Sequence, residues 1–309
     1  MNASNFKDGK ITMLTTFSQQ ITLPIHYQPR SIRQQLIDWY LPRRMQHFLR
    51  SERQILINGQ YQPVSSLLHG GEQITLNFNH LDIIQPHYLP SSLPLTICYE
   101  DAHLLIINKP AGQKTHPNWP TENDTAMNTA THYLNQQQQM PFITHRLDQA
   151  TSGLLVIAKD PISAPILNRQ LTTKTFQRSY LTIVKGKLTN AGTINLPIGR
   201  VNNDPRRRWI NQPNSQPAIT NYHVITTNGQ YSVLLVQLQT GRTHQIRVHL
   251  AASGHPIVGD PLYSNDAQRY QRMYLHATQV KLILPFTAIQ LVVNCPAPFY
   301  DNLPINDWK

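Results

Sequence analysis

The segment HRLDQATSGLLVIAK, from His145 to Lys159, joins a polar turn to an apolar run. Asp148 stands just before the small residues of the turn, and Leu154 to Ala158 follow as uninterrupted apolar residues. A short apolar run of this kind predicts a strand that is buried on both faces. A carboxylate directly before such a strand is held rigidly, and nearby cations would keep it ionised as a nucleophile or base. A turn-capping aspartate that accepts backbone hydrogen bonds is at least as good an interpretation of this segment alone.

Further strands are predicted on both sides of this segment. They are Leu95–Tyr99, His103–Asn108, Ser179–Val184, Ile219–Thr226, Tyr231–Leu238, Met273–Lys281 and Ala288–Val293. Helices are predicted at Thr125–Gln137, after Asp160-Pro161, and from Thr243 to Gly254. Most strands follow one another without a regular helix between them. The pattern predicts an α+β fold with a mixed, mainly antiparallel central sheet that is flanked by helices and loops.

The first 80 residues predict a separate small α/β domain. Ser31 to Arg53 has helical spacing that Pro42 interrupts, and strands are predicted at Gln54–Asn58 and Gln73–Phe78. The helical part carries an arginine-rich face that includes Arg43, Arg44 and Arg50. Guanidinium groups bind phosphate bidentately, so this face suits a nucleic-acid backbone, although a solvated charged surface is the plain alternative.

Three regularly spaced prolines predict an extended linker between this domain and the rest of the chain. Pro86, Pro90 and Pro94 stiffen the chain and remove backbone donors. We therefore expect a small domain at residues 1–80, a linker at 81–94 and a catalytic domain at 95–309.

The amino-acid composition and net charge indicate which class of partner the protein binds. The chain has 309 residues and a net charge of +11, and its 40% apolar content is enough for a sizeable core. Two cysteines, Cys98 and Cys295, form neither a disulfide framework nor a metal pattern, which fits a reducing compartment. The start of the chain has no signal-peptide pattern, and no apolar run approaches a membrane span. We expect a cytoplasmic protein with no membrane association and a polyanionic partner, with nucleic acid first.

Other polar segments carry candidate site residues. In GRTHQIRVHLAASGHPIVGDPLYS, Arg242 stands at a strand-to-helix junction, where it could partner a carboxylate while the helix contacts phosphates. Basic decoration of a helix is the plain alternative. The spacing of His244, His249 and His255 does not fit a zinc site, so no metal is predicted. Tyr180 ends a basic run, where it could be a core residue or could stack on a nucleobase.

Two further basic segments contain candidate residues. Arg206, Arg207 and Arg208, beside Trp209, form either a phosphate-binding loop or a solvated loop between strands. Lys109, with Pro110, marks a sharp turn after a predicted buried strand.

Together these segments resemble the RluA-type RNA pseudouridine synthase family. The resemblance covers about Leu95 to Phe286. It rests on YEDAHLLIINKPAG with THP, HRLDQATSGLLVIAK, the segment ending at Tyr180, PIGR, GRTHQIRVHLAASGHPIVGDPLYS and LHA, in that order. Leu41 to Gln60 more weakly resembles the small RNA-binding domain named after ribosomal protein S4. It departs from that domain in having Ser51 to Arg53 where a glycine usually precedes the strand, and Gly71-Glu72 for the usual Gly-Asp pair.

The resemblance implies an isomerase that converts specific uridines of structured RNA to pseudouridine without a cofactor. Carried over by motif, Asp148 is the catalytic aspartate, Arg242 pairs with it, and Tyr180 stacks on the target base. Tyr180 could also remove the proton from carbon 5, and Ile246 packs against the base. Arg146 occupies the space that the flipped uridine leaves.

The remaining residues in this prediction would contact RNA. They are His145, Lys109, Arg247, Arg206, Arg207, Arg208, Arg43, Arg44 and Arg50. The S4-like domain favours large-subunit ribosomal RNA over tRNA, by family-level analogy. We expect a monomer, and we expect deletion of Met1–Leu81 mainly to weaken RNA binding or to alter site choice.

Several alternatives stay open. Asp148 either attacks the sugar or abstracts a proton to give a glycal. A non-catalytic RNA-binding or ribosome-assembly factor would use the same fold as a scaffold, although the joint presence of Asp148, Tyr180 and Arg242 argues against it. A nucleoside hydrolase is disfavoured, because no second acidic residue stands in a motif.

Overall fold

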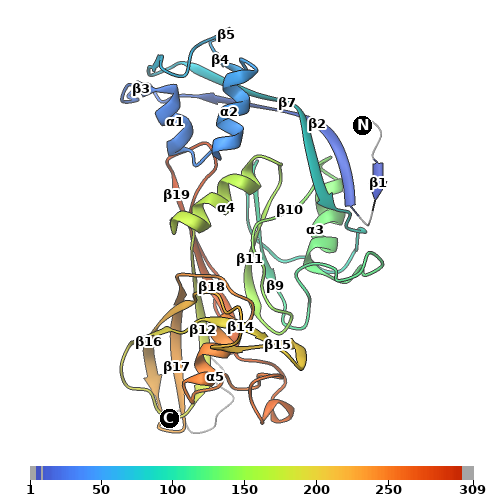
Figure 1. Cartoon of the computed structure of the whole chain (residues 1–309), viewed down its shortest axis with the longest axis vertical. Helices are drawn as coiled ribbons and strands as arrows, with labels where there is room; N and C mark the ends of the chain where they lie inside the picture. The colour runs from blue at the N-terminus through green and yellow to red at the C-terminus, as the bar shows by residue number, and fades with distance from the viewer. Residues whose placement is uncertain (1–4, 8–9, 301–309) are drawn as a thin grey trace.

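A computed structural model describes residues 5–7 and 10–300, which form a small N-terminal part above a larger part (Figure 1). The N-terminal part contains a five-stranded sheet in the order β1-β2-β7-β4-β5 and two helices. Its elements are β1 (Asn5–Lys7), β2 (Lys10–Thr22), β3 (Arg30–Ser31), α1 (Ile32–Asp38), α2 (Arg43–Ser51), β4 (Ile55–Ile57), β5 (Gln60–Tyr61), β6 (Leu67–Leu68) and β7 (Gln73–Pro86). The predicted helix break is confirmed, because Pro42 is the N-cap of α2 in extended conformation.

The linker prediction was wrong in its first six residues. Strand β7 continues to Pro86 and pairs with β2 from Gln73↔Thr22 to Pro86↔Lys10, so 81–86 belong to a long antiparallel ribbon. Pro86 is tolerated because it is the last residue of the strand, where a missing backbone donor breaks no interior ladder bond. Regular structure is absent only from residues 87–96 of this connection.

The larger part is built on a ten-stranded sheet. The main path has the order β13-β16-β17-β12-β18-β11-β9-β8, with β10 on β11 and β19 on β18. Its strands are β8 (Ile97–Glu100), β9 (Leu104–Lys109), β10 (Phe142–Ile143), β11 (Ser152–Ala158), β12 (Gln177–Lys185), β13 (Gly192–Asn195), β16 (Ile219–Thr227), β17 (Tyr231–Leu238), β18 (Leu275–Ile283) and β19 (Gln290–Asn294). All pairs are antiparallel except β11 with β18, which confirms the predicted mixed, mainly antiparallel sheet.

Helices and a separate hairpin surround this sheet (Figure 1). They are α3 (Ala126–Asn135), α4 (Ser163–Thr173), α5 (Gln245–Ala252), the short 3-10 helix η1 (Ala267–Arg269), and the pair β14 (Ile198–Val201) and β15 (Asp204–Ile210). The loop predicted at Arg206 to Arg208 is therefore a strand, which pairs Arg208 with Arg200.

The parallel contact between β11 and β18 depends on one glycine. Ser152 pairs with His276 and Gly153 with Ala277. Gly153 has φ +106°, and a Cβ there would lie 2.3 Å from the carbonyl oxygen of Ala277. Only glycine lets the two backbones approach this closely at the start of β11.

The two parts of the chain share an apolar core. The N-terminal cluster includes Trp39, and it extends to Ile162, Ile166 and Phe286 of the larger part. The rings of Trp39 and Phe286 meet edge to face with centroids 6.1 Å apart. Arg169 on α4 donates a hydrogen bond to the Leu41 carbonyl at 3.4 Å. The N-terminal part is thus packed against α4 and the β18–β19 turn.

Candidate active site

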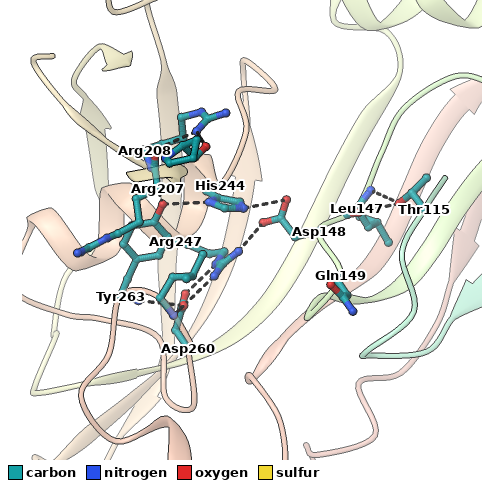
Figure 2. Close-up of polar contacts among 12 residues, drawn as sticks. Thr115, Leu147, Asp148, Gln149, Arg207, Arg208, His244, Arg247, Asp260 and Tyr263 are labelled. Carbon is teal, nitrogen blue, oxygen red and sulfur yellow. Dashed lines mark hydrogen bonds and ion pairs between the residues drawn. The ribbon is translucent and has the colours of Figure 1, made fainter. Parts of the chain in front are cut away.

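The loop that carries Asp148 lies between β10 and β11 and is fastened on both sides. Thr115 donates its hydroxyl to the Leu147 carbonyl at 2.7 Å and accepts the Leu147 N–H at 3.0 Å (Figure 2). On the other side, the Gly112 N–H donates to the Gln149 carbonyl at 2.8 Å. These bonds fix the residues that flank Asp148, so its side chain extends from a rigid stretch of backbone.

Lys109 reinforces the same loop from beneath. Its ammonium donates to the carbonyls of Pro110 at 2.9 Å, Gln113 at 2.7 Å and Gln149 at 3.5 Å, and its side chain is fully buried. Burial lowers the pKa of Lys109 to about 7, against an opposing effect of Asp148. The predicted RNA contact of Lys109 is wrong, because a buried ammonium with three carbonyl partners holds the loop together.

The Asp148 carboxylate points toward α5 and not into its own turn (Figure 2). Arg247 Nη1 donates to Asp148 Oδ2 at 3.2 Å, and His244 Nε2 lies 4.0 Å from Oδ1. Thr151 N–H bonds the backbone carbonyl of Asp148, so the backbone makes the turn. The carboxylate is thereby left to face a cavity, with its side chain 17% exposed.

Arg247 is held in place by a second carboxylate. Its Nε donates to Asp260 Oδ2 and its Nη2 donates to Asp260 Oδ1, both at 2.8 Å. The side chain of Asp260 is fully buried. Burial alone would favour the neutral guanidine, but the hydrogen bonds and charge of Asp260, together with Asp148, raise the pKa of Arg247. A permanent, oriented positive charge therefore stands beside Asp148.

The predicted pairing of Arg242 with Asp148 was wrong. Arg242 donates its Nε to the carbonyl of Pro217 at 3.0 Å, and Arg247, five residues later, makes the ion pair. Arg242 still lines the same cavity as Asp148. The predicted RNA contact of Arg247 is accordingly replaced by a role within the protein, because its side chain is only 3% exposed.

Tyr180 and Ile246 line the cavity that Asp148 faces. Tyr180 comes from β12 and Ile246 from α5, and both are almost fully buried. Burial raises the pKa of Tyr180, with a smaller opposing effect of Arg178, so its hydroxyl is protonated at neutral pH. An aromatic ring, an aliphatic side chain and a carboxylate thus meet in one concave site, which is the arrangement expected for holding a flat base.

His145 does not lie where a base contact would require. It is buried, and its Nε2 accepts the Val156 N–H at 3.0 Å while its ring meets Phe176 edge to face. Burial lowers the pKa of His145 to about 3, so it is neutral. The prediction that His145 binds RNA was wrong, because the buried imidazole bonds the backbone of Val156 within the core strand β11.

The remaining predicted RNA contacts are exposed or line other cavities. Arg146 is exposed and borders the Asp148 cavity, and Arg206 and Arg208 line a neighbouring cavity of about 910 Å³ that Asp148 also borders. Arg207 lies over the ring of Tyr263 at 5.5 Å. On α2, more than 100 residues before Arg206, the side chains of Arg43, Arg44 and Arg50 are exposed. Arg43 and Arg50 border a separate basic hollow.

Three supporting residues were missed from the sequence. Thr115, Asp260 and Tyr263 all stand in the quoted motifs, but no role was predicted for them. The Tyr263 hydroxyl forms a hydrogen bond with His244 Nδ1 at 2.9 Å and accepts the backbone N–H of Arg208 at 2.9 Å. A buried arginine requires a carboxylate partner, so Asp260 could have been found by asking what pairs with Arg247.

Two absences hold for the described part of the chain. Residues 5–7 and 10–300 contain no group of three His, Cys, Asp or Glu side chains placed to hold a metal ion. Over the same residues, no helix has the length and apolar content needed to cross a membrane.

Comparison with known proteins identifies the family of this chain. A family model described as RNA pseudouridylate synthase matches residues 103–252, and a model described as RluD ribosomal pseudouridine synthase N-terminal domain matches residues 19–74. The uncharacterized RNA pseudouridine synthase YhcT of Bacillus subtilis (strain 168) is 40% identical over 253 residues, which cover 80% of this chain and 83% of that protein. Ribosomal large subunit pseudouridine synthase D of Escherichia coli (strain K12) is 33% identical over 265 residues, covering 80% of each chain.

A solved structure supports the same assignment. Human RNA Pseudouridylate Synthase Domain Containing 1 aligns with a TM-score of 0.59 and 27% identity, over 70% of this chain and 89% of that one. The chain therefore belongs to the RNA pseudouridine synthase family, of the RluA type, and is an isomerase that acts on RNA.

Proposed function

We propose that this isomerase converts uridine to pseudouridine in large-subunit ribosomal RNA, with Asp148 as its catalytic carboxylate. The observation that carries the proposal is the cavity in which Asp148, oriented by Arg247, faces the buried ring of Tyr180. Ribosomal RNA is favoured because relatives that align over most of this chain carry large-subunit names. A ribosomal substrate also favours a cytoplasmic location.

The reaction moves one glycosidic bond within the same nucleotide. The bond from N1 to C1′ breaks, the uracil turns, and a bond from C5 to C1′ forms, while C5 loses a proton and N1 gains one. Oxidation states balance, so the chain needs no cofactor. Asp148 Oδ2 is occupied by Arg247, and Oδ1 is therefore the oxygen offered to the sugar, as a nucleophile at C1′ or as a base.

The residues around Asp148 serve to hold the flipped base. The ring of Tyr180 stacks on the uracil as an uncharged surface, because its raised pKa keeps the hydroxyl protonated. Ile246 packs at the base edge, and the exposed Arg146 stands two residues before Asp148, where it fills the space left in the RNA. The basic face of α2, with Arg43, Arg44 and Arg50, contributes affinity through phosphate contacts.

Release of tritium from RNA labelled at uridine carbon 5 tests this proposal. Large-subunit rRNA and bulk tRNA are offered separately to wild type, Asp148→Ala and Arg247→Lys. We expect release from the ribosomal RNA only, no release with Asp148→Ala, and a loss of 100-fold or more with Arg247→Lys, on the order of an acid–base or positioning contribution. Arg247→Lys keeps a charge against Asp260 but cannot bind both carboxylates.

Three outcomes would contradict the proposal in different ways. Release only from tRNA would reject the ribosomal substrate. Retained release in Asp148→Ala, with the variant shown to be folded by its melting curve, would reject the catalytic role of Asp148. RNA binding without any release from rRNA, tRNA or pre-ribosomal particles would favour a non-catalytic assembly factor.

A further inference from the structure

A second cavity of about 660 Å³ adjoins the active-site cavity. The two share a wall made by Arg146, Arg178, Leu238, Gly241 and Arg242. Among the described residues that line the second cavity, four have cationic side chains and none is an aspartate or a glutamate. These cations are Arg146, Lys174, Arg178 and Arg242. A hollow whose described charged side chains are all cationic, and which adjoins the active-site cavity, has the electrostatic character of a polyanion groove.

Among the described residues, neither Arg178 nor the exposed Arg146 has a hydrogen bond or ion pair through its side chain, and Arg178 is the more buried of the two. It stands on β12 two residues before Tyr180, is half-buried, and its Nε is buried with no hydrogen-bond partner. Within the described residues, no carboxylate lies within ion-pair distance of it. Arg242 and Lys174, by contrast, each donate to a backbone carbonyl.

Gly241 lies beside the guanidinium of Arg178. A Cβ on Gly241 would lie 3.3 Å from Arg178 Nη2, so the absence of a side chain at Gly241 leaves room for this group at the shared wall. Burial raises the pKa of Tyr180 and lowers the pKa of His145. The charge of Arg178 is the next largest effect on both groups, and it lowers both pKa values. A partly buried positive charge without a counter-ion is costly unless an anion arrives with a ligand.

We propose that Arg178 binds a phosphate of the RNA strand next to the flipped uridine, and that the basic cavity receives the strand on that side of the active site. The inference rests on the proposed function and adds a substrate contact to it. A guanidinium matches phosphate oxygens with two parallel hydrogen bonds, which fixes the strand in position as well as attracting it. The contact places the sugar of the flipped nucleotide relative to Asp148.

The test measures RNA binding and turnover as a function of salt. Arg178→Gln and Arg178→Lys are compared with wild type and with Lys187→Gln, which removes the same charge from an exposed position just beyond the other end of β12. Equilibrium dissociation constants for one rRNA fragment are determined from 50 to 200 mM salt, and KM, kcat and the pH profile are determined by tritium release. Melting curves establish that each variant is folded.

For Arg178→Gln we expect the slope of log K against log salt to fall by about 0.7, the value for one contact on a single strand. The dissociation constant and KM should rise about tenfold, as for one lost charge-assisted hydrogen bond. Arg178→Lys should recover the salt slope and only part of the KM, because a lysine is a point charge without the fork. The pH profile should not move, and Lys187→Gln should match wild type.

Other results would overturn the inference. An unchanged salt slope with a lower kcat and a shifted pH profile would mean that Arg178 acts on Tyr180 instead of on phosphate. An equal loss of slope in Lys187→Gln would mean that the charge acts non-specifically. These results leave the proposed function standing, whereas wild type that binds RNA and releases no tritium refutes the proposed function while the salt slopes still test Arg178.

Discussion

Arg242 and Arg247 show how far single residues can be assigned from this sequence. Both belong to one motif, and the motif correctly located the cation beside Asp148, but the ion pair is made by Arg247. The choice depends on how α5 is rotated, and this helix is buried at six consecutive positions from Gln245 to Leu250, so no polar face marks its orientation. Asp148, Tyr180 and Ile246 line one cavity, although Asp148 lies in the loop before β11, Tyr180 within β12 and Ile246 near the start of α5.

Lys109 gives a prediction about pH at the residue scale. Its pKa in the folded protein is about 7, below the value near 10.5 of a free lysine. Between these pH values the unfolded chain binds a proton that the folded chain has released, so stability rises as the pH increases from 7 toward 10. Lys109→Met should remove this rise, which is at most about 1.4 kcal/mol per pH unit.

Urea unfolding of wild type and Lys109→Met at pH 7 and pH 9 measures this effect. The stability of wild type relative to the variant should increase between the two pH values, and Lys187→Met, at an exposed site, should behave like wild type. Parallel pH dependence in wild type and Lys109→Met would show that Lys109 keeps its proton in the folded state.

At the scale of elements, strands with strong apolar patterns were predicted from the sequence, whereas polar strands were not. The buried strand β11 and the neighbouring strands β16 and β17 lie close to where the sequence predicted them, since runs rich in apolar residues leave few alternatives. The strand β15, which holds Arg206 to Arg208, and the long strand β2 were missed. In β15 the side chains are mostly exposed or half-buried, so no alternation of apolar and polar residues marks the strand.

Gly153 allows a matched test of the junction between β11 and β18. Gly153→Ala would place a Cβ 2.3 Å from the Ala277 carbonyl, whereas Gly229→Ala meets nothing within 4 Å, and both glycines have positive φ. We expect Gly229→Ala to cost about 1 kcal/mol from backbone strain alone. Gly153→Ala should cost about 3 kcal/mol or more, because overpacking adds to that strain. Equal free energies of unfolding for the two variants would mean that the strands separate easily here.

For the whole molecule, the shared core changes what the N-terminal part is expected to do. Its deletion was predicted mainly to weaken RNA binding, but Ile162, Ile166 and Phe286 of the larger part pack into the N-terminal cluster. Removing residues 1–81 would expose these side chains to water. The sequence could not reveal this contact, because each of the three residues reads equally well as part of the catalytic core.

Ile166→Ala tests whether the two parts unfold together. Loss of a fully buried isoleucine should lower the free energy of unfolding by about 2–5 kcal/mol, in one cooperative transition of the whole chain. Asn168→Ala, an exposed position on the same helix, should change little. The measurement is a calorimetric melt with intrinsic tryptophan fluorescence as a second probe. Two separate transitions, with only the N-terminal one shifted, would show that the parts are energetically independent.

The parallel pairing of Ser152 with His276 joins two strands that are synthesised at different times. A chain is made from its N-terminus at about 5–20 residues per second, so β18 follows β11 out of the ribosome after on the order of ten seconds. During that interval the Asp148 loop exists without the strand beside it. Arg247 and Asp260 also arrive late, roughly 100 residues after Asp148. A nascent chain therefore carries its basic N-terminal helices well before it carries a finished catalytic centre, and activity begins only after β18 has been made.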